Sequence, residues 1–303
     1  MTSESVRDAA TAPDPRRISP LLRAMRPRQW VKNVLVLAAP LAAGRIGDAD
    51  VLMTTGLAFV VFCAASAAVY LGNDVRDAEE DRRHPIKQHR PVAAGTLAPA
   101  TALIASGVLA VVSTGAGILV ALDFGITVAV YLAVQASYTL GLKHQPVIDL
   151  ACVASGFLLR AVAGGVASGI ALSPWFLLVA SFGSLFMVAG KRFSEVYTLG
   201  AAAETRRSLH GYSESYLRFV WSMAASVTVL AYSLWAFTEA GGHGDPPWAE
   251  LSVAPFVVGM LRYAVDIDRG SAGAPEDIVL EDRVLQVLGL MWSVMVALVV
   301  YAR

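Results

Sequence analysis

The chain contains few charged residues and only two cysteines. Of its 303 residues, 16% are charged and 56% are hydrophobic, whereas a soluble globular protein has about 25% charged residues. This shortage of charge argues against a soluble domain and predicts a polytopic membrane protein. Cys63 and Cys152 show neither metal-ligand spacing nor a pattern of disulfide partners, so we expect both to be packing residues.

The N-terminus lacks the apolar stretch of a signal peptide. Residues 1–20 are instead rich in Pro, Arg, Asp, Ser and Ala, which is typical of a disordered tail. The rest of the chain, residues 21–303, contains nine apolar runs of roughly the length of a membrane span. The runs are 30–45, 50–72, 98–120, 124–142, 146–169, 174–190, 215–238, 251–268 and 283–302. We therefore expect an all-α membrane protein with nine transmembrane helices in one domain.

Positive charge is scarce on one side of these expected spans. If the N-terminal tail is cytoplasmic, the opposite side holds only Arg45 and Arg303, while the other Lys and Arg residues outside the spans lie on the cytoplasmic side. Positive residues in membrane proteins accumulate in cytoplasmic segments. The sequence thus predicts a multi-pass protein of the cell (plasma) membrane with a cytoplasmic N-terminus.

Carboxylates are concentrated where the second expected span ends. Asn73, Asp74, Asp77 and Asp81, here called the first acidic cluster, are followed at once by cations that include Arg82, Arg83, Lys87 and Arg90. If the helix continues past the span, the three aspartates lie within an arc of about 60° on one face. Three carboxylates and an amide oxygen suit Mg²⁺, which commonly bridges to phosphate. The alternative is a solvated loop with assorted ion pairs.

Other polar residues stand near the cytoplasmic ends of the expected spans. Lys32 and Asn33 lie deepest in a cationic entry to the first span, and either bind a ligand or anchor the span. Lys143 lies in a short cytoplasmic turn before the fifth span. Arg160 lies 11 residues beyond Asp149, about 16 Å along a helix. An Arg at that depth faces the protein interior, and both a structural pairing and a ligand role stay open.

A second charged cluster, Lys191, Arg192 and Glu195, follows the sixth expected span. Because four spans separate it from the first acidic cluster, both lie on the same side of the membrane. On a continuing helix, Glu195 is four residues from Lys191 and three from Arg192, which is suitable spacing for ion pairs. The cluster either binds a ligand or forms surface ion pairs.

The pattern Asn-Asp-x-x-Asp-x-x-x-Asp at residues 73–81, after the second of nine spans, resembles the UbiA superfamily of intramembrane prenyltransferases. The likeness extends over residues 28–33, 143–149 and 156–165. It implies a UbiA-like helical bundle with its active site on the cytoplasmic side. The resemblance also implies that this motif binds Mg²⁺ and a diphosphate, and that a second acidic motif after the sixth span completes the site.

The chain departs from that pattern at the second motif. Most relatives have paired aspartates there, whereas this chain has Lys191, Arg192 and Glu195. With Gly190–Glu195, Arg26–Asn33 and Leu261–Arg269, the chain resembles the branch that makes decaprenylphosphoryl-5-phosphoribose. That resemblance implies transfer of 5-phosphoribose from phosphoribosyl pyrophosphate to decaprenyl phosphate, with release of diphosphate, for synthesis of cell-wall arabinan. The extra phosphates of these substrates require extra cations.

Residue roles follow from the two clusters and the resemblance together. We expect catalytic roles for Asp74, Asp77, Lys191 and Glu195, and Mg²⁺ binding by Asp74, Asp77 and Asp81. The expected substrate-binding residues are Lys32, Asn33, Asn73, Arg82, Arg83, Lys87, Arg90, Lys143, Arg160 and Arg192.

Two other functions compete with phosphoribosyl transfer. One is a conventional prenyltransferase that moves a prenyl chain from its diphosphate to a small acceptor. The other is a solute transporter, although transporters place their polar sites near the bilayer midplane, where this chain has only Arg160. Membrane lipids are expected partners and nucleic acid is not, while a homo-oligomer is left open.

Overall fold

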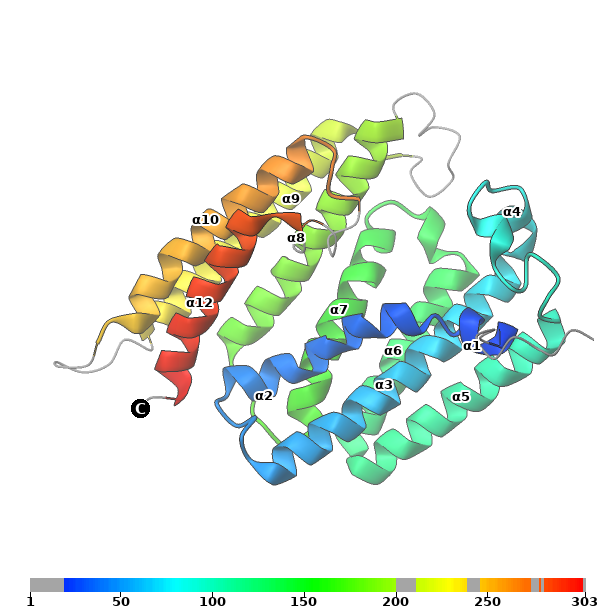
Figure 1. Ribbon diagram of the computed structural model, residues 1–303, viewed down its shortest axis with the longest axis horizontal. Coiled ribbons are helices and arrows are strands. Elements are labelled where there is room, and N and C mark those ends of the chain that lie inside the picture. Colours follow the sequence, from blue (N-terminus) through cyan, green and yellow to red (C-terminus); the bar gives the residue numbers. More distant parts are fainter. Residues whose placement is uncertain (1–18, 200–210, 239–245, 274–277, 279–280, 302–303) are drawn as a thin grey trace, which may run out of the picture.

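The computed structural model describes residues 19–199, 211–238, 246–273, 278 and 281–301, and the described residues form helices without any strand (Figure 1). Most of the expected tail, residues 1–18, lies outside the described residues. The long helices are α3 (Ala49–Arg76), α5 (Pro99–Val120), α6 (Leu122–Leu140), α7 (Ile148–Ala167), α8 (Pro174–Leu199), α9 (Glu214–Thr238), α10 (Trp248–Asp268) and α12 (Arg283–Tyr301). The shorter ones are α1 (Pro20–Ala24), η1 (Pro27–Leu37), α2 (Ala38–Ala42), α4 (Ala78–Arg82), η2 (Lys87–His89) and η3 (Leu142–His144).

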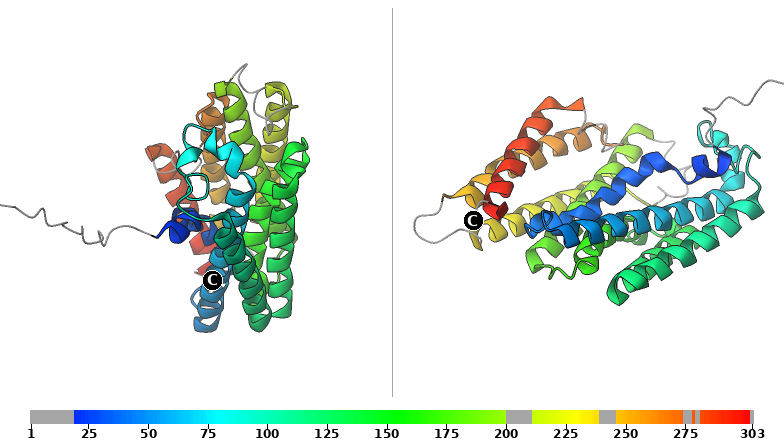
Figure 2. Two further views of the ribbon diagram at one scale, coloured as in Figure 1. Left: turned by 90° about the vertical axis from the view of Figure 1, so that its right-hand side faces the viewer. Right: turned by 60° about the horizontal axis from the view of Figure 1, so that its bottom comes forward.

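Among the described residues, six helices are long and apolar enough to cross a membrane, namely α3, α5, α7, α8, α9 and α12. Helices α6 and α10 form where two further spans were expected, at 124–142 and 251–268. In α5 and α12, only 11% and 6% of the most apolar window is buried inside the protein. These two helices lie at opposite edges of the bundle (Figure 2). Their exposed apolar side chains are suited to contact with lipid.

The first expected span, 30–45, is not one continuous α-helix. It consists of the 3₁₀ helix η1 followed by the short α2, which contains Pro40. Because proline has no backbone N–H, the carbonyl of Val36 loses its α-helical partner. A Cβ added at Gly164 would lie 1.7 Å from this carbonyl oxygen. Gly164 is therefore needed for the close packing of η1 on α7.

Two hydrophobic cores meet along α7. One joins η1, α3, α6 and α7 around Phe62, Phe124 and Val128. The other joins α7, α8, α9 and α10 around Phe186 and Phe193. The C-terminal end of α3, which with α4 carries the first acidic cluster, and the C-terminal end of α8, which carries the second charged cluster, lie at the same end of the bundle (Figure 1). The cores therefore bring residues far apart in sequence to one end of the molecule.

The helix through the first acidic cluster is interrupted at Asp77. This residue ends α3 and precedes α4, with a ψ of 6° that is not α-helical. The three aspartates were expected to share one helical face only if the helix continued past the span. Because the helix is interrupted at Asp77, this expectation fails. Asp74 and Asp81 are buried and share the partner Arg90, while Asp77 contacts Lys143.

Candidate active site

A cavity of about 840 Å³ lies between η1, α3, α6, α7 and α8. Its charged lining comes mainly from the helix ends and the connections beside them, and includes the cations Arg26, Lys32, Lys87, Arg90, Lys143, Lys191 and Arg192. Four carboxylates share this region, namely Asp77, Glu80, Asp81 and Glu195. Apolar side chains of Leu35, Val153, Phe157, Val179, Met187 and Val188 form another part of the wall. The cavity thus combines an excess of positive charge with an apolar surface, which suits an amphipathic anion.

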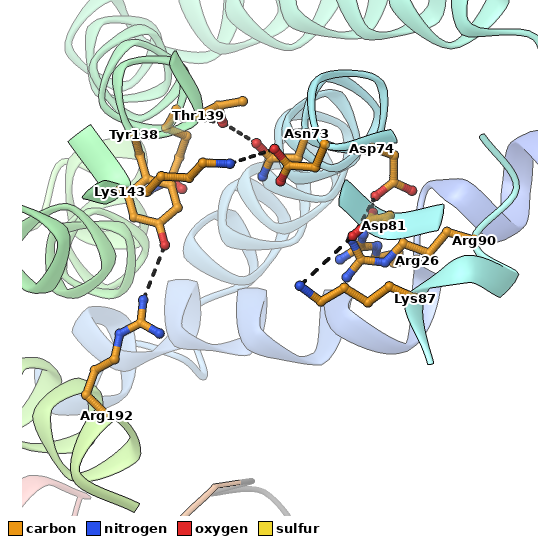
Figure 3. A network of polar contacts seen from close by, with 12 residues as sticks. Arg26, Asn73, Asp74, Asp81, Lys87, Arg90, Tyr138, Thr139, Lys143 and Arg192 are labelled. Atoms are coloured by element: carbon orange, nitrogen blue, oxygen red, sulfur yellow. Dashed lines mark hydrogen bonds and ion pairs between the residues drawn. The ribbon is translucent and has the colours of Figure 1, made fainter. Parts of the chain in front are cut away.

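Two aspartates of the first acidic cluster are held by arginines. Asp74 accepts a hydrogen bond from Arg26, and its Oδ1 lies 3.6 Å from Nη1 of Arg90. Asp81 accepts a 2.6 Å hydrogen bond from the same Arg90 nitrogen and lies 4.0 Å from Nζ of Lys87 (Figure 3). Both aspartates are 1% exposed. Their charges are therefore compensated by cations that also line the cavity.

The other two residues of this cluster face α6 and η3. Nζ of Lys143 donates a 2.6 Å hydrogen bond to Asp77. Thr139 donates a hydrogen bond to Asn73 (Figure 3). Both Asn73 and Asp77 line the cavity. The cluster is thus divided, because Asp74 and Asp81 share Arg90 whereas Asn73 and Asp77 contact Thr139 and Lys143. Among the described residues, no three His, Cys, Asp or Glu side chains converge on one metal position.

The donor atoms of the cluster nevertheless suit Mg²⁺. All are carboxylate or amide oxygens, which hard cations prefer. Within the described part of the chain, Oδ2 of Asp74 is buried and has no hydrogen-bond donor. A buried carboxylate oxygen without a donor is costly in a protein, and a cation would satisfy it.

In the second charged cluster, Arg192 is the central residue. Its Nε and Nη2 lie 3.2 Å and 3.1 Å from Oδ2 of Asp149, and its Nη1 donates a 2.8 Å hydrogen bond to Glu195. Tyr138 accepts a further hydrogen bond at 3.4 Å. Helix α8 continues to Leu199, beyond the expected end of the span at residue 190, and the ion pair between Arg192 and Glu195 forms. Lys191 is exposed and lines the same cavity.

Several expected site residues, among them Asp74, do not line this cavity. Asn33 and Arg160 are buried, and Nε of Arg160 donates a 2.8 Å hydrogen bond to Oδ1 of Asn33. Arg160 also donates to the Gly156 carbonyl, Ser66 and Tyr131. This network joins η1, α3, α6 and α7, so it forms the structural pairing that the sequence left open. Arg82 and Arg83 are exposed and lie outside the cavity lining.

The structure also brings residues to the site that had no expected role. Arg26, Glu80 and Tyr138 line the cavity, and buried Asp149 holds Arg192. Arg26 and Asp149 were visible in charged segments, but their partners are distant in sequence. Only the fold shows that Arg26 lies beside Asp74 and that Asp149 lies beside Arg192.

Comparison with known proteins agrees with this architecture. The chain is 50% identical over 290 residues to the decaprenyl-phosphate phosphoribosyltransferase of Mycobacterium tuberculosis (strain CDC 1551 / Oshkosh), covering 94% of this chain and 95% of that protein. It is 48% identical over 297 residues to the protein of that name from Corynebacterium glutamicum, covering 93% and 86%.

The fold is similar to that of a solved UbiA homolog from Archaeoglobus fulgidus bound to DMAPP and Mg²⁺. The TM-score is 0.69 at 15% sequence identity, over 94% of this chain and 99% of the other. The model of the UbiA prenyltransferase family matches residues 34–279, which include both charged clusters and most of the residues that line the cavity. The chain therefore belongs to the UbiA prenyltransferase family.

Proposed function

We infer that this chain transfers 5-phosphoribose from phosphoribosyl pyrophosphate to a polyprenyl phosphate and releases diphosphate. The observation that carries this inference is the cavity, where seven Lys or Arg side chains and four carboxylates adjoin an apolar wall. Both substrates bring phosphate groups, and the acceptor also brings an apolar chain. The relatives at about half identity, which are named decaprenyl-phosphate phosphoribosyltransferases, support the same substrates.

The apolar wall suits the lipid acceptor. Exposing a polyprenyl chain to water costs about 0.8 kcal/mol per CH₂ group. The chain therefore stays in apolar surroundings while only its phosphate reaches the charged region. Val179 and Met187 of α8 lie on this wall, and Lys191 stands one helical turn beyond Met187. We place the lipid phosphate near Lys191 and Arg192.

The first acidic cluster suits the diphosphate of the donor. Within the divided cluster, Asp74, Asp77, Asp81 and Asn73 are the residues that would supply oxygen ligands to Mg²⁺, which would stabilise negative charge on the departing diphosphate. Each substrate phosphate monoester adds about −1.5 to −2 charges by analogy with phosphorylated side chains. Lys32, Lys87, Arg90 and Lys143 line this part of the cavity and would neutralise them.

In the reaction, an oxygen of the acceptor phosphate attacks the anomeric carbon of the ribose. The new C–O bond forms as the bond from that carbon to the diphosphate oxygen breaks. The residues of the cavity align the two anions and offset their mutual repulsion, which lowers the barrier by orientation and charge stabilisation. Asp74, Asp77, Lys191 and Glu195 are the residues to which we assign catalytic roles.

We further propose that the protein is a plasma-membrane enzyme with nine membrane spans and that residues 21–303 form its catalytic domain. The distribution of Lys and Arg supports a cytoplasmic N-terminus and a cytoplasmic active site. Such an orientation gives the site access to a water-soluble donor on one side and to a lipid acceptor within the bilayer. The product would serve synthesis of cell-wall arabinan.

A radiochemical assay tests the function. Purified protein in detergent is incubated with labelled phosphoribosyl pyrophosphate, Mg²⁺ and a polyprenyl phosphate, and the expected product is a labelled lipid. The matched control is Asp77→Asn, which should give none. If wild type makes no labelled lipid but consumes a prenyl diphosphate with a small acceptor, conventional prenyl transfer replaces the proposal.

A further inference from the structure

The segment Gly211–Tyr212, just before α9, packs on the turn that leads into α7. Gly211 has a φ of +95°, and a Cβ there would lie 2.9 Å from Cγ of Pro146. Only glycine accommodates both the left-handed backbone and this close approach. Tyr212 is 9% exposed. Two segments more than sixty residues apart are thus fitted closely together.

The Tyr212 hydroxyl makes two hydrogen bonds within this contact. It accepts one from the backbone N–H of Val147 at 2.7 Å, and it donates one to Oδ1 of Asp149. Val147 has a φ of +72°, which is rare for a β-branched residue and persists only where its surroundings enforce it. Burial and the bond to Asp149 raise the pKa of Tyr212, so the hydroxyl stays protonated and keeps donating. The hydroxyl therefore fixes both the turn and the carboxylate.

Asp149 divides its two oxygens between Tyr212 and Arg192. It is 1% exposed, and its Oδ2 accepts a hydrogen bond from Nε of Arg192 and forms an ion pair with Nη2 at 3.1 Å. Glu195 accepts a 2.8 Å hydrogen bond from Nη1 of the same guanidinium. Because the guanidinium is a rigid planar fork, contacts on both its sides fix its plane as well as its position. Arg192 lines the cavity, whereas Asp149 and Tyr212 do not.

We propose that Asp149 and Tyr212 are positioning residues that hold the Arg192 guanidinium in the orientation that binds a substrate phosphate. This inference rests on the proposed function, because it assumes that Arg192 contacts phosphate. Asp149 and Tyr212 touch no substrate and act only through Arg192. Glu195 contacts the other side of the guanidinium.

The test is a double-mutant cycle of anion binding. Tyr212→Phe keeps the ring and removes both hydrogen bonds. Dissociation constants are measured by calorimetry in detergent for inorganic pyrophosphate with Mg²⁺ and for a short-chain polyprenyl phosphate. Arg192→Gln should weaken at least one of them by about 10²-fold, and Tyr212→Phe should weaken the same one by about tenfold. In the Arg192→Gln background, Tyr212→Phe should add less than about twofold.

Two further variants make the result decisive. Tyr216→Phe is the matched control, because its partly exposed ring stacks on Tyr212 and it should bind both anions like wild type. Asp149→Asn keeps the size of the side chain but removes its charge, and should reproduce the effect of Tyr212→Phe if that variant does not fold.

The outcomes separate the inference from the proposed function. The inference is overturned if Tyr212→Phe weakens anion binding equally in the wild-type and Arg192→Gln backgrounds. It is also overturned if Tyr212→Phe lowers the melting temperature but leaves anion binding unchanged, because the contact is then only structural. If Arg192→Gln itself binds both anions like wild type, the phosphate role of Arg192 in the proposed function fails, and the inference fails with it.

Discussion

Replacing Asp74 or Asp77 with Asn should abolish turnover in both cases but destabilise the protein in only one. Both substitutions remove a carboxylate charge that we assign to Mg²⁺ binding, so each should remove nearly all activity. Asp74 is paired with Arg26 and is 1% exposed, whereas Asp77 is paired with Lys143 and is 26% exposed. The two variants therefore have the same expected effect on catalysis and different expected effects on folding.

The size of the difference follows from burial. Loss of a hydrogen bond to a charged group costs about 1.5–3 kcal/mol. Arg26 is 26% exposed and can regain water, so we expect about 2 kcal/mol for Asp74→Asn. At about 2–4 °C per kcal/mol, its Tm should fall by roughly 4–8 °C. Asp77 and Lys143 form a partly exposed pair worth about 0–1 kcal/mol, so Asp77→Asn should shift Tm by less than roughly 4 °C.

Thermal unfolding in detergent and the labelled-lipid assay would measure both effects. Asp48→Asn is the control. It removes an ion pair between Arg45 and Asp48, whose side chains are 51% and 52% exposed and lie at the opposite end of α3 from the cluster. This control should leave both quantities unchanged. Wild-type Tm for Asp74→Asn would refute the burial argument, and wild-type kcat for both variants at saturating Mg²⁺ would refute the metal assignment.

Four other results are expected. Lys191→Ala should lower kcat/KM for the sugar donor or the lipid phosphate by about 10²-fold, and Lys191→Glu by more; steady-state kinetics like wild type would instead leave Lys191 a surface residue. Arg83→Ala should leave both KM values unchanged, because Arg83 is exposed outside the cavity, and a raised KM would return it to the site. Arg160→Lys should lower Tm, because Lys cannot reproduce the four donor contacts of the guanidinium, and unchanged unfolding would contradict the structural role. EDTA should stop labelled-lipid formation and added Mg²⁺ should restore it, whereas activity in EDTA would exclude a required metal.

Much of the fold could be predicted from hydrophobic runs alone. Eight of the nine runs correspond to long helices, because each is a predominantly apolar stretch of helical length. Counting spans also predicted that the two charged clusters lie on the same side, since an even number of crossings returns the chain to that side, and both clusters do lie at one end of the bundle (Figure 1). Asp77, Lys143 and Lys191 do line one cavity.

The pairing within the site could not be predicted in this way. Arg26 and Asp74 are 48 residues apart, and Tyr212 and Asp149 are 63 apart. No local pattern selects one arginine among many as the partner of a given aspartate. The interruption at Asp77 was equally hidden, because Asp77 keeps its helical hydrogen bond to Asn73 while its ψ departs from the helical value. One non-helical residue was enough to divide the aspartates.

The 3₁₀ geometry of η1 explains why Lys32 reaches the cavity and its neighbour Asn33 does not. With three residues per turn, side chains at i and i+3 lie on the same face. Lys32 and Leu35 line the cavity, Asn33 and Val36 are fully buried, and Val31 and Val34 are 61% and 47% exposed. The three faces of η1 therefore line the cavity, join the core and face the surroundings in turn. Arg160 holds Asn33 and Gly164 admits the backbone at Val36, so the buried face fixes the rotation of η1 and thereby directs Lys32 into the site.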